Sequence, residues 1–256
     1  MKRLIVLLVC AVLMSNIYAA PVKDYYQLLV YHFNSSEQEK MIDSYLQTAF
    51  LPAMHKSGFK NIGVFAPIAN DTAADKKIYV LLTLKNPTQI AEWNENMLKN
   101  KVAESNASSF WNSPHSAPSY TRMESILIRA WEMAPKMNLP ALKGPKDQHI
   151  YELRSYESPT DRLYWNKVHM FNEGGEVKLF ARLNFNAVFY GDVLAGDRMP
   201  NLMYMTSFES MEDRETHWKE FGSSPEWKKL ISMDEYKNNV SKSDIILMKA
   251  KPYSDF

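Results

Sequence analysis

An internal duplication constrains the fold of this chain more than any other feature of its sequence. The segment 24–130 and the segment 149–250 show the same succession of hydrophobic patterns. Each begins with a short aromatic and aliphatic stretch, YYQLLVY at Tyr25–Tyr31 and IYELRSY at Ile150–Tyr156. A pattern repeated at this length indicates two similar structural units in one chain.

The first copy alternates between strand-like and helix-like periodicity. After the opening strand, an amphipathic helix is predicted at 37–56, followed by strands at 60–66 and 78–84. A second helix is predicted around Trp93, and a last strand at 125–130 closes the copy. The resulting order is βαββαβ, which is typical of a ferredoxin-like unit with an antiparallel sheet and both helices on one face.

The second copy repeats this order. Its first helix is predicted at 159–181, its second around Trp218, and its later strands at 185–191, 202–208 and 245–250. A unit of this kind leaves the other face of its sheet bare, and a broad bare face rarely stays uncovered. We therefore predict an α+β fold of two tandem ferredoxin-like units whose sheets pair within the chain into a barrel-like arrangement.

The repeat also divides the chain. The first unit is expected at 24–132 and the second at 149–252. Between them, residues 133–148 contain three prolines and one glycine, a composition that is typical of a linker.

The beginning of the chain has the pattern of a secretory signal peptide. Lys2 and Arg3 precede an apolar run at 4–14, and a stretch ending in small residues follows up to Ala19. The apolar run is shorter than the roughly 20 residues that a membrane-spanning helix needs. A signal peptide at 1–19 therefore predicts an exported protein, periplasmic or secreted, that is not inserted in a membrane after cleavage.

Cysteine content and charge exclude several classes of site. Cys10 is the only cysteine, so the predicted mature protein has neither disulfides nor thiolate metal ligands nor a cysteine nucleophile. Removal of Lys2 and Arg3 leaves 28 basic and 29 acidic residues. A nearly neutral chain has no long-range field that attracts nucleic acid or anionic lipid, so neither partner is predicted.

Several apolar motifs carry a family resemblance. The second copy contains IYELRSY at 150–156, NAVFYGD at 186–192 and LMYMTSFES at 202–210, and the first contains LPAMHKSGFKNIGVFAP at 51–67. These motifs resemble those of the NIPSNAP family, a branch of the dimeric α/β-barrel superfamily, over nearly all of the mature chain. With its secretory leader, the chain looks like a bacterial, exported tandem member.

The resemblance implies the ferredoxin-like fold and the pairing of two sheets. Relatives in the wider superfamily include haem-degrading and quinone-forming monooxygenases, which bind substrate in the cleft between sheet and helices. The motifs of this chain are apolar rather than catalytic, so they identify a fold family better than a function.

The candidate ligand-binding residues lie in the second copy. Period-two alternation places Glu152, Arg154 and Tyr156 on one face of its first strand. One interpretation is that Glu152 and Arg154 face solvent at the rim of the sheet or form a structural pair across the interface. The other is that Arg154 orients an anion in a cavity lined by Tyr156, Tyr190 and Tyr204.

His169 is the candidate catalytic residue. It shares a helix face with Trp165, and a histidine in this setting is more often packed or half-exposed than catalytic. The six histidines show no paired spacing of the kind that zinc-binding helices use, so no metal is predicted. Gly174 and Gly175 do not form a phosphate loop and are expected to loosen or end a helix, and no cofactor is predicted.

Three classes of function stay open. The leading one is a binding protein that encloses a small, partly apolar or aromatic ligand in a cavity between the sheets. The second is an enzyme of monooxygenase or isomerase type, with His169 or Tyr156 as acid or base and Arg154 holding an anionic substrate. The third is an interaction module of the cell envelope, and self-association is left open. We lean toward a protein that is not an enzyme.

Overall fold

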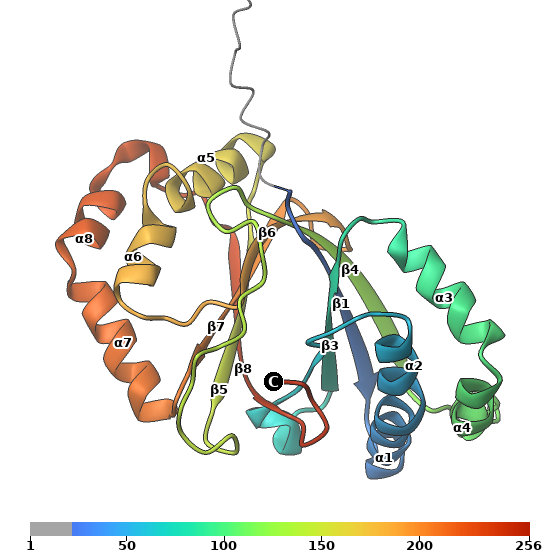
Figure 1. Ribbon diagram of the computed structural model, residues 1–256. Coiled ribbons are helices and arrows are strands. Elements are labelled where there is room, and N and C mark those ends of the chain that lie inside the picture. Colours follow the sequence, from blue (N-terminus) through green and yellow to red (C-terminus); the bar gives the residue numbers. More distant parts are fainter. Residues whose placement is uncertain (1–21) are drawn as a thin grey trace, which may run out of the picture.

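The eight strands found in the described part of the chain form one closed barrel (Figure 1). The structure is a computed structural model that describes residues 22–256, so the signal peptide expected at 1–19 lies outside the described residues. The strand order around the barrel is β1-β3-β2-β8-β5-β7-β6-β4, and neighbouring strands are antiparallel. The predicted α+β fold, with sheets paired within the chain, is confirmed.

Each half of the chain supplies four strands in the same relative order. The first half supplies β1 (Tyr25–Phe33), β2 (Gly63–Pro67), β3 (Lys76–Leu84) and β4 (Arg122–Ala130). The second half supplies β5 (Ile150–Glu157), β6 (Phe189–Ala195), β7 (Asn201–Phe208) and β8 (Lys242–Ala250). Within each half the first and third strands are central, which is the order expected of a ferredoxin-like unit.

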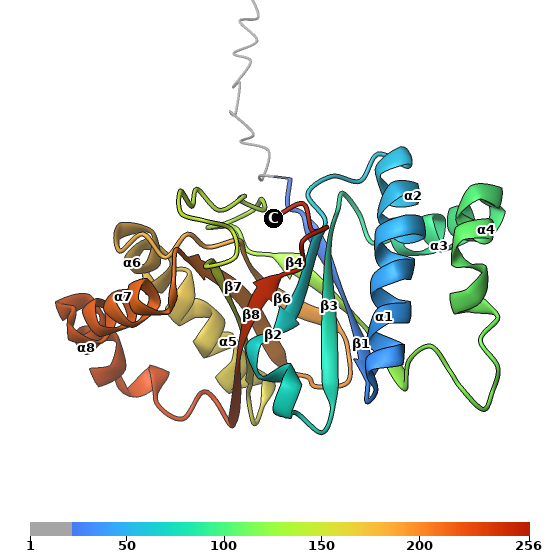
Figure 2. The same ribbon diagram turned by 90° about the horizontal axis from the view of Figure 1, so that it is seen from below.

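Helices cover the outside of the barrel on two sides (Figure 2). Those of the first half are α1 (Ser36–Tyr45), a π-helical turn (Leu46–Phe50), α2 (Leu51–Lys56), a 3-10 turn (Ile68–Thr72), α3 (Gln89–Lys99) and α4 (Lys101–Trp111). Those of the second half are α5 (Asp161–Phe171), α6 (Glu176–Arg182), α7 (Met211–Ser223), α8 (Pro225–Ser232) and a 3-10 turn (Asp234–Tyr236). Among the described residues, no helix has the length and apolar character needed to cross a bilayer.

The helix predicted at 159–181 is interrupted as its glycines suggested. Helix α5 ends at Phe171, and α6 begins at Glu176. Gly175 has a φ of 94°, in the left-handed region that favours glycine, and it directly precedes α6. The expectation that Gly174 and Gly175 interrupt the helix is confirmed.

Period-two alternation divides the apolar side chains of the strands between two cores. In β1, Tyr26 and Leu28 point into the barrel, whereas Leu29 and Tyr31 pack against the helices of the first half. The barrel interior therefore receives side chains from both halves, and each outer face is covered by the helices of its own half.

Two short seams join the halves. Strand β2 pairs with β8 through Phe65–Pro67, and β4 pairs with β6 through Leu127–Ala130. One end of the barrel is filled by the rings of Phe65, Tyr151 and Phe256, with Phe256 reaching in from the C-terminal tail. The opposite end is left open.

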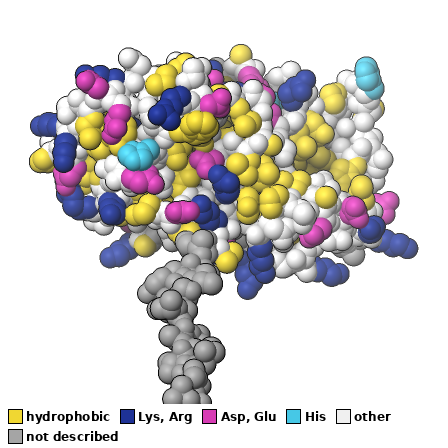
Figure 3. Space-filling view, turned by 90° about the horizontal axis from the view of Figure 1, so that it is seen from above, with side chains coloured by type: hydrophobic (Ala, Val, Ile, Leu, Met, Phe, Trp, Pro, Cys, Tyr) yellow, Lys and Arg dark blue, Asp and Glu magenta, His cyan; other side chains and the backbone are white. Residues whose placement is uncertain are grey.

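Charged side chains of both signs are interspersed over the face of the molecule shown in Figure 3. This distribution agrees with the formal net charge of +1 for the whole sequence. The face shows no region of a single sign that would attract a polyanion.

Candidate functional site

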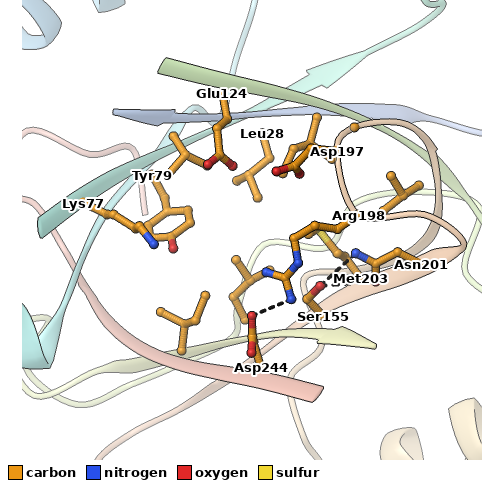
Figure 4. Close-up of a pocket in the computed structure, with 16 residues that line it drawn as sticks. Leu28, Lys77, Tyr79, Glu124, Ser155, Asp197, Arg198, Asn201, Met203 and Asp244 are labelled. Carbon is orange, nitrogen blue, oxygen red and sulfur yellow. Dashed lines mark hydrogen bonds and ion pairs between the residues drawn. The ribbon is translucent and has the colours of Figure 1, made fainter. Parts of the chain in front are cut away.

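A pocket occupies the open end of the barrel, between the two half-barrels (Figure 4). Its volume is about 100 Å³, and both halves of the chain line it. The apolar walls are formed by inward-facing side chains of six strands: Leu28, Val30, Ile126, Leu153, Val193, Met203 and Ile246. A cavity between the sheets was expected, and the structure contains one.

The rim of the pocket carries ion pairs. Arg198 donates from Nε to Glu157 at 2.5 Å, and its terminal nitrogen lies 2.6 Å from Asp244. Lys77 lies 3.2 Å from Asp75. Both cationic side chains of the rim are therefore already engaged by carboxylates of the same chain.

His32 lies at the same end of the barrel, between two carboxylates. Its Nδ1 is 2.8 Å from Asp75, and its Nε2 is 2.8 Å from Glu124, which lines the pocket. The ring thus links Asp75 to Glu124, and this contact holds Glu124 in the pocket wall.

Tyr79 is a buried polar group of the pocket. Tyr79 as a whole is 5% exposed. Its hydroxyl makes no hydrogen bond to another described residue and is accessible from the pocket. Burial raises the pKa of Tyr79, and the negative charges of Glu124 and Asp75 raise it further, so the phenol stays neutral. Figure 4 shows its hydroxyl directed into the pocket.

The predicted ligand-binding residues do not line this pocket. In β5, Leu153 and Ser155 point into the barrel, so Glu152, Arg154 and Tyr156 lie on the opposite face, beneath the helices of the second half. Their predicted location in a cavity between the sheets is therefore wrong. The residues do come together, but in a different layer of the molecule.

Glu152 is the centre of that cluster and is fully buried, with 0% exposure. Its Oε1 accepts a hydrogen bond from Nε of Arg154 at 2.5 Å. Its Oε2 accepts from Nε of Arg214 at 2.6 Å and from Nε1 of Trp218 at 2.9 Å. The guanidinium of Arg154 also stacks on Trp218 at 3.7 Å from the ring centroid.

The three predicted tyrosines continue the network. Arg154 donates to the hydroxyl of Tyr156 at 2.8 Å, and this hydroxyl lies 3.1 Å from that of Tyr204. The ring of Tyr190 stacks on Tyr204 with centroids 5.6 Å apart. Of the two interpretations of the charged pair, the structure favours the structural one, although the pair lies beneath the helices of the second half and neither at the rim of the sheet nor across the interface.

A second buried ion pair, absent from the sequence-based prediction, adjoins this network. Nζ of Lys167 lies 3.1 Å from Oε2 of Glu176, and both side chains are buried. Burial raises the pKa of Glu176, and the positive charge of Lys167 opposes that rise. The two residues are nine positions apart on two helices, so only the break between α5 and α6 brings them together.

The first half contains an uncharged version of the same arrangement. Nε1 of Trp93 donates to Oε1 of Gln27 at 2.8 Å, and Trp93 and Gln27 match Trp218 and Glu152 in the repeat. Both tryptophans thus reach from the helix layer to the first strand of their own sheet. At the matching positions the second half has a carboxylate in place of the amide, together with two arginines.

The structure does not bring His169 to either site. Its Nδ1 lies 2.8 Å from the hydroxyl of Tyr236, and the two rings pack with centroids 5.9 Å apart. The contact joins α5 to the 3-10 turn that precedes β8. Within residues 22–256, no group of three or more histidines, cysteines and carboxylates is placed to hold a metal ion.

Pocket residues such as Tyr79, Glu124 and Arg198 were missed by sequence reasoning. Tyr79 lies in the third strand of the first copy, at the position that Met203 has in the second copy. A polar side chain at this inward-facing position was the signal in the sequence that could have indicated the pocket. The position of Arg198, outside any strand, is set by the loop between β6 and β7.

Comparisons with known proteins add a family and a fold. Residues 151–255 match the family model described as NIPSNAP. A NIPSNAP family protein from Agrobacterium tumefaciens is 17% identical and superposes with a TM-score of 0.37, over 42% of this chain and 97% of that chain. No curated protein matches the sequence. The resemblance to the NIPSNAP family is confirmed for the second half of the chain.

Two solved structures resemble the whole barrel. A candidate monooxygenase from Fusobacterium nucleatum superposes with a TM-score of 0.57 at 7% identity, over 90% of this chain and 93% of that chain. Another from Lactobacillus acidophilus gives a TM-score of 0.56 at 11% identity, over 89% and 94%. At such identities the likeness shows the fold alone.

Proposed function

We propose, from the premise that residues 151–255 form a NIPSNAP domain within a two-repeat barrel, that this protein binds a small, partly apolar molecule in the pocket between the half-barrels. One observation carries the proposal: the two repeats together enclose an apolar cavity with polar groups at its rim. Ligand sites commonly combine apolar walls with a few convergent polar groups.

The volume of the pocket sets the size of the ligand. Sites for drug-sized molecules measure roughly 300–1,000 Å³, whereas this cavity holds about 100 Å³. It therefore suits a short chain or small ring, or the apolar end of a longer molecule. Each methylene that is buried would contribute about 0.8 kcal/mol to binding.

The placement of the catalytic candidates favours binding over the proposed enzyme. Tyr156 and Arg154 lie on the far face of the sheet from the pocket, and His169 packs against Tyr236. An acid or base must reach the bound substrate within hydrogen-bond distance. These three residues therefore cannot serve a ligand held inside the barrel in the present arrangement.

We also propose that binding takes place outside the cytoplasm, in the periplasm or the medium. The support is the pattern of the first 19 residues, with Lys2 and Arg3 ahead of an apolar run and small residues. The ligand would then be one that is found in the envelope or the surroundings of the cell.

A pocket-filling variant tests the proposal. In Ile246→Trp, the indole would occupy the cavity from its rim, because Ile246 lines the pocket. We expect compounds that raise the Tm of the wild-type protein in a thermal-shift screen to lose that effect in the variant. Native mass spectrometry would show whether a ligand co-purifies with the wild-type protein and not with the variant.

Ile245→Trp is the matched control, because its side chain lies on the outer side of β8 and is 48% exposed. This variant should respond to ligands as the wild type does. If no compound stabilises the wild type and no ligand co-purifies, or if Ile246→Trp responds like the control, the proposed function is wrong.

A further inference from the structure

The open end of the barrel carries an excess of negative charge. Five carboxylates surround it: Asp75, Glu124, Glu157, Asp197 and Asp244. The cationic groups there are Lys77, Arg198 and His32. Even with His32 protonated, the carboxylates outnumber the cations by two.

The ion pairs leave specific acceptors free. Glu124 accepts from His32 through Oε1, and its other oxygen has no partner among the described residues. Asp197 lines the pocket, and no interaction joins its carboxylate to another described residue. Figure 4 shows both carboxylates on the same side of the pocket.

Tyr79 adds an observation that is independent of charge. A hydroxyl that makes no hydrogen bond within the protein and faces a cavity is available to a ligand or to water. The hydroxyl of Tyr79 is directed into the cavity from a side chain that is 95% buried, since only 5% is exposed. Its lone pairs offer a ligand one more acceptor within the pocket.

We infer that the pocket selects a cation with an apolar body, that is, a protonated amine whose ammonium group lies among Asp197, Glu124 and Tyr79. The inference rests on the proposed function and specifies its ligand class. The apolar walls would take the hydrocarbon part, and the ammonium hydrogens would be donated to the free oxygens. An anion would find Lys77 and Arg198 already neutralised by their carboxylates.

The cation is an ammonium rather than a metal ion. A divalent metal needs several ligands converging on one point, and no such group exists within the described part of the chain. The carboxylates of the rim are instead spread among Lys77, Arg198 and His32. One ammonium, with three donors and an apolar stem, fits acceptors that are spread in this way.

Three probes of equal length test the inference: n-butylammonium, n-butanol and n-butanoate, titrated into the full chain and followed by calorimetry and ligand-observed NMR. We expect the ammonium to bind more tightly than the alcohol, and the carboxylate more weakly than either. Asp197→Asn should lower the ratio of ammonium to alcohol affinity about two- to fivefold, the range of a partly exposed charge pair. Higher salt should lower the same ratio.

Asp147→Asn is the matched control. It removes the same charge just before β5, whereas Ser155, which lines the pocket, lies near the other end of that strand. It should leave the ratio unchanged. If alcohol and ammonium bind equally and both are excluded by Ile246→Trp, the ligand class is wrong and the proposed function stands. If no probe binds and the Ile246→Trp screen also shows no ligand, the proposed function itself fails.

Discussion

At the scale of single residues, Gln27 and Glu152 show how the two repeats have diverged. Each accepts a hydrogen bond from the tryptophan of its own helix layer, Trp93 in one half and Trp218 in the other. A buried carboxylate is costly unless its charge is compensated. In the second half, Arg154 and Arg214 supply that compensation, so the carboxylate and the arginines depend on each other.

Replacing Glu152 by Gln should therefore destabilise the fold strongly. The change leaves Arg154 buried without an ion-pair partner and leaves Arg214 with the exposed Glu215 alone. The loss of one partner from a buried ion pair costs about 3–5 kcal/mol. Urea unfolding, followed by tryptophan fluorescence, would measure the loss.

The matching residues of the first half suggest a variant that should restore the stability lost in Glu152→Gln. Glu152→Gln combined with Arg154→Leu and Arg214→Gln restores the residue types that the first copy has at Gln27, Leu29 and Gln89. We expect the triple variant to be more stable than Glu152→Gln alone, because no buried charge is left uncompensated. If the free energy of unfolding of the triple variant falls by the sum of the losses of the three single variants, the interdependence of these residues is contradicted.

At the scale of elements, a carboxylate that follows β7 is one of the groups that hold the linker. Glu209 follows β7 and accepts hydrogen bonds from the backbone N–H groups of Lys143 at 2.8 Å and Gly144 at 2.7 Å. These bonds lower the pKa of Glu209 from its ordinary value of 4.5. Residues 133–148, expected as a linker from their prolines, are thus attached at a defined point.

The attachment predicts a pH dependence. Because the folded pKa of Glu209 is lowered, its contribution to stability is present above about pH 4.5 and is lost as the pH falls through the folded pKa. Its side chain is 36% exposed, so the contribution should stay below about 1 kcal/mol. The Tm difference between wild type and Glu209→Gln should be measurable at pH 7 and vanish near pH 3; an equal difference at both values would exclude this role.

At the scale of the whole molecule, barrel closure depends on a close approach of β4 and β6. Gly191 faces Ala130 across this seam, and a Cβ added at Gly191 would lie 2.5 Å from the carbonyl oxygen of Arg129 and 2.5 Å from Cγ2 of Ile128. This is one of the two seams that join the repeats, so its pairing is needed to enclose the pocket between them.

Gly191→Ala should therefore weaken the union of the halves. Overpacking of this kind costs about 1–3 kcal/mol, and here the nearest atom is backbone, which cannot move aside as a side chain can. Thermal unfolding should show a lowered Tm. Gly222→Ala in α7 is the control, since nothing lies within 4 Å of the added Cβ; it should be neutral or stabilising by up to about 1 kcal/mol.

The repeat, the order of strands and helices and the break at Gly174 and Gly175 could be read from the sequence, because periodicity and backbone freedom are local properties. The same alternation grouped Glu152, Arg154 and Tyr156 on one face of a strand. It could not say which face is inward, since both faces of β5 are buried, one in the barrel and the other beneath the helices.

The sequence by itself thus determined the order of the strands and of the main helices, the duplication and which side chains share a face, but it did not predict α4 and α8 as separate helices. Only the tertiary structure decided that these faces point to the helices and that Tyr79, Glu124 and Asp197 surround one cavity. The physical reason is that the pocket is built from strands of both repeats. Their register across the barrel depends on long-range packing, which leaves no local signal in either strand.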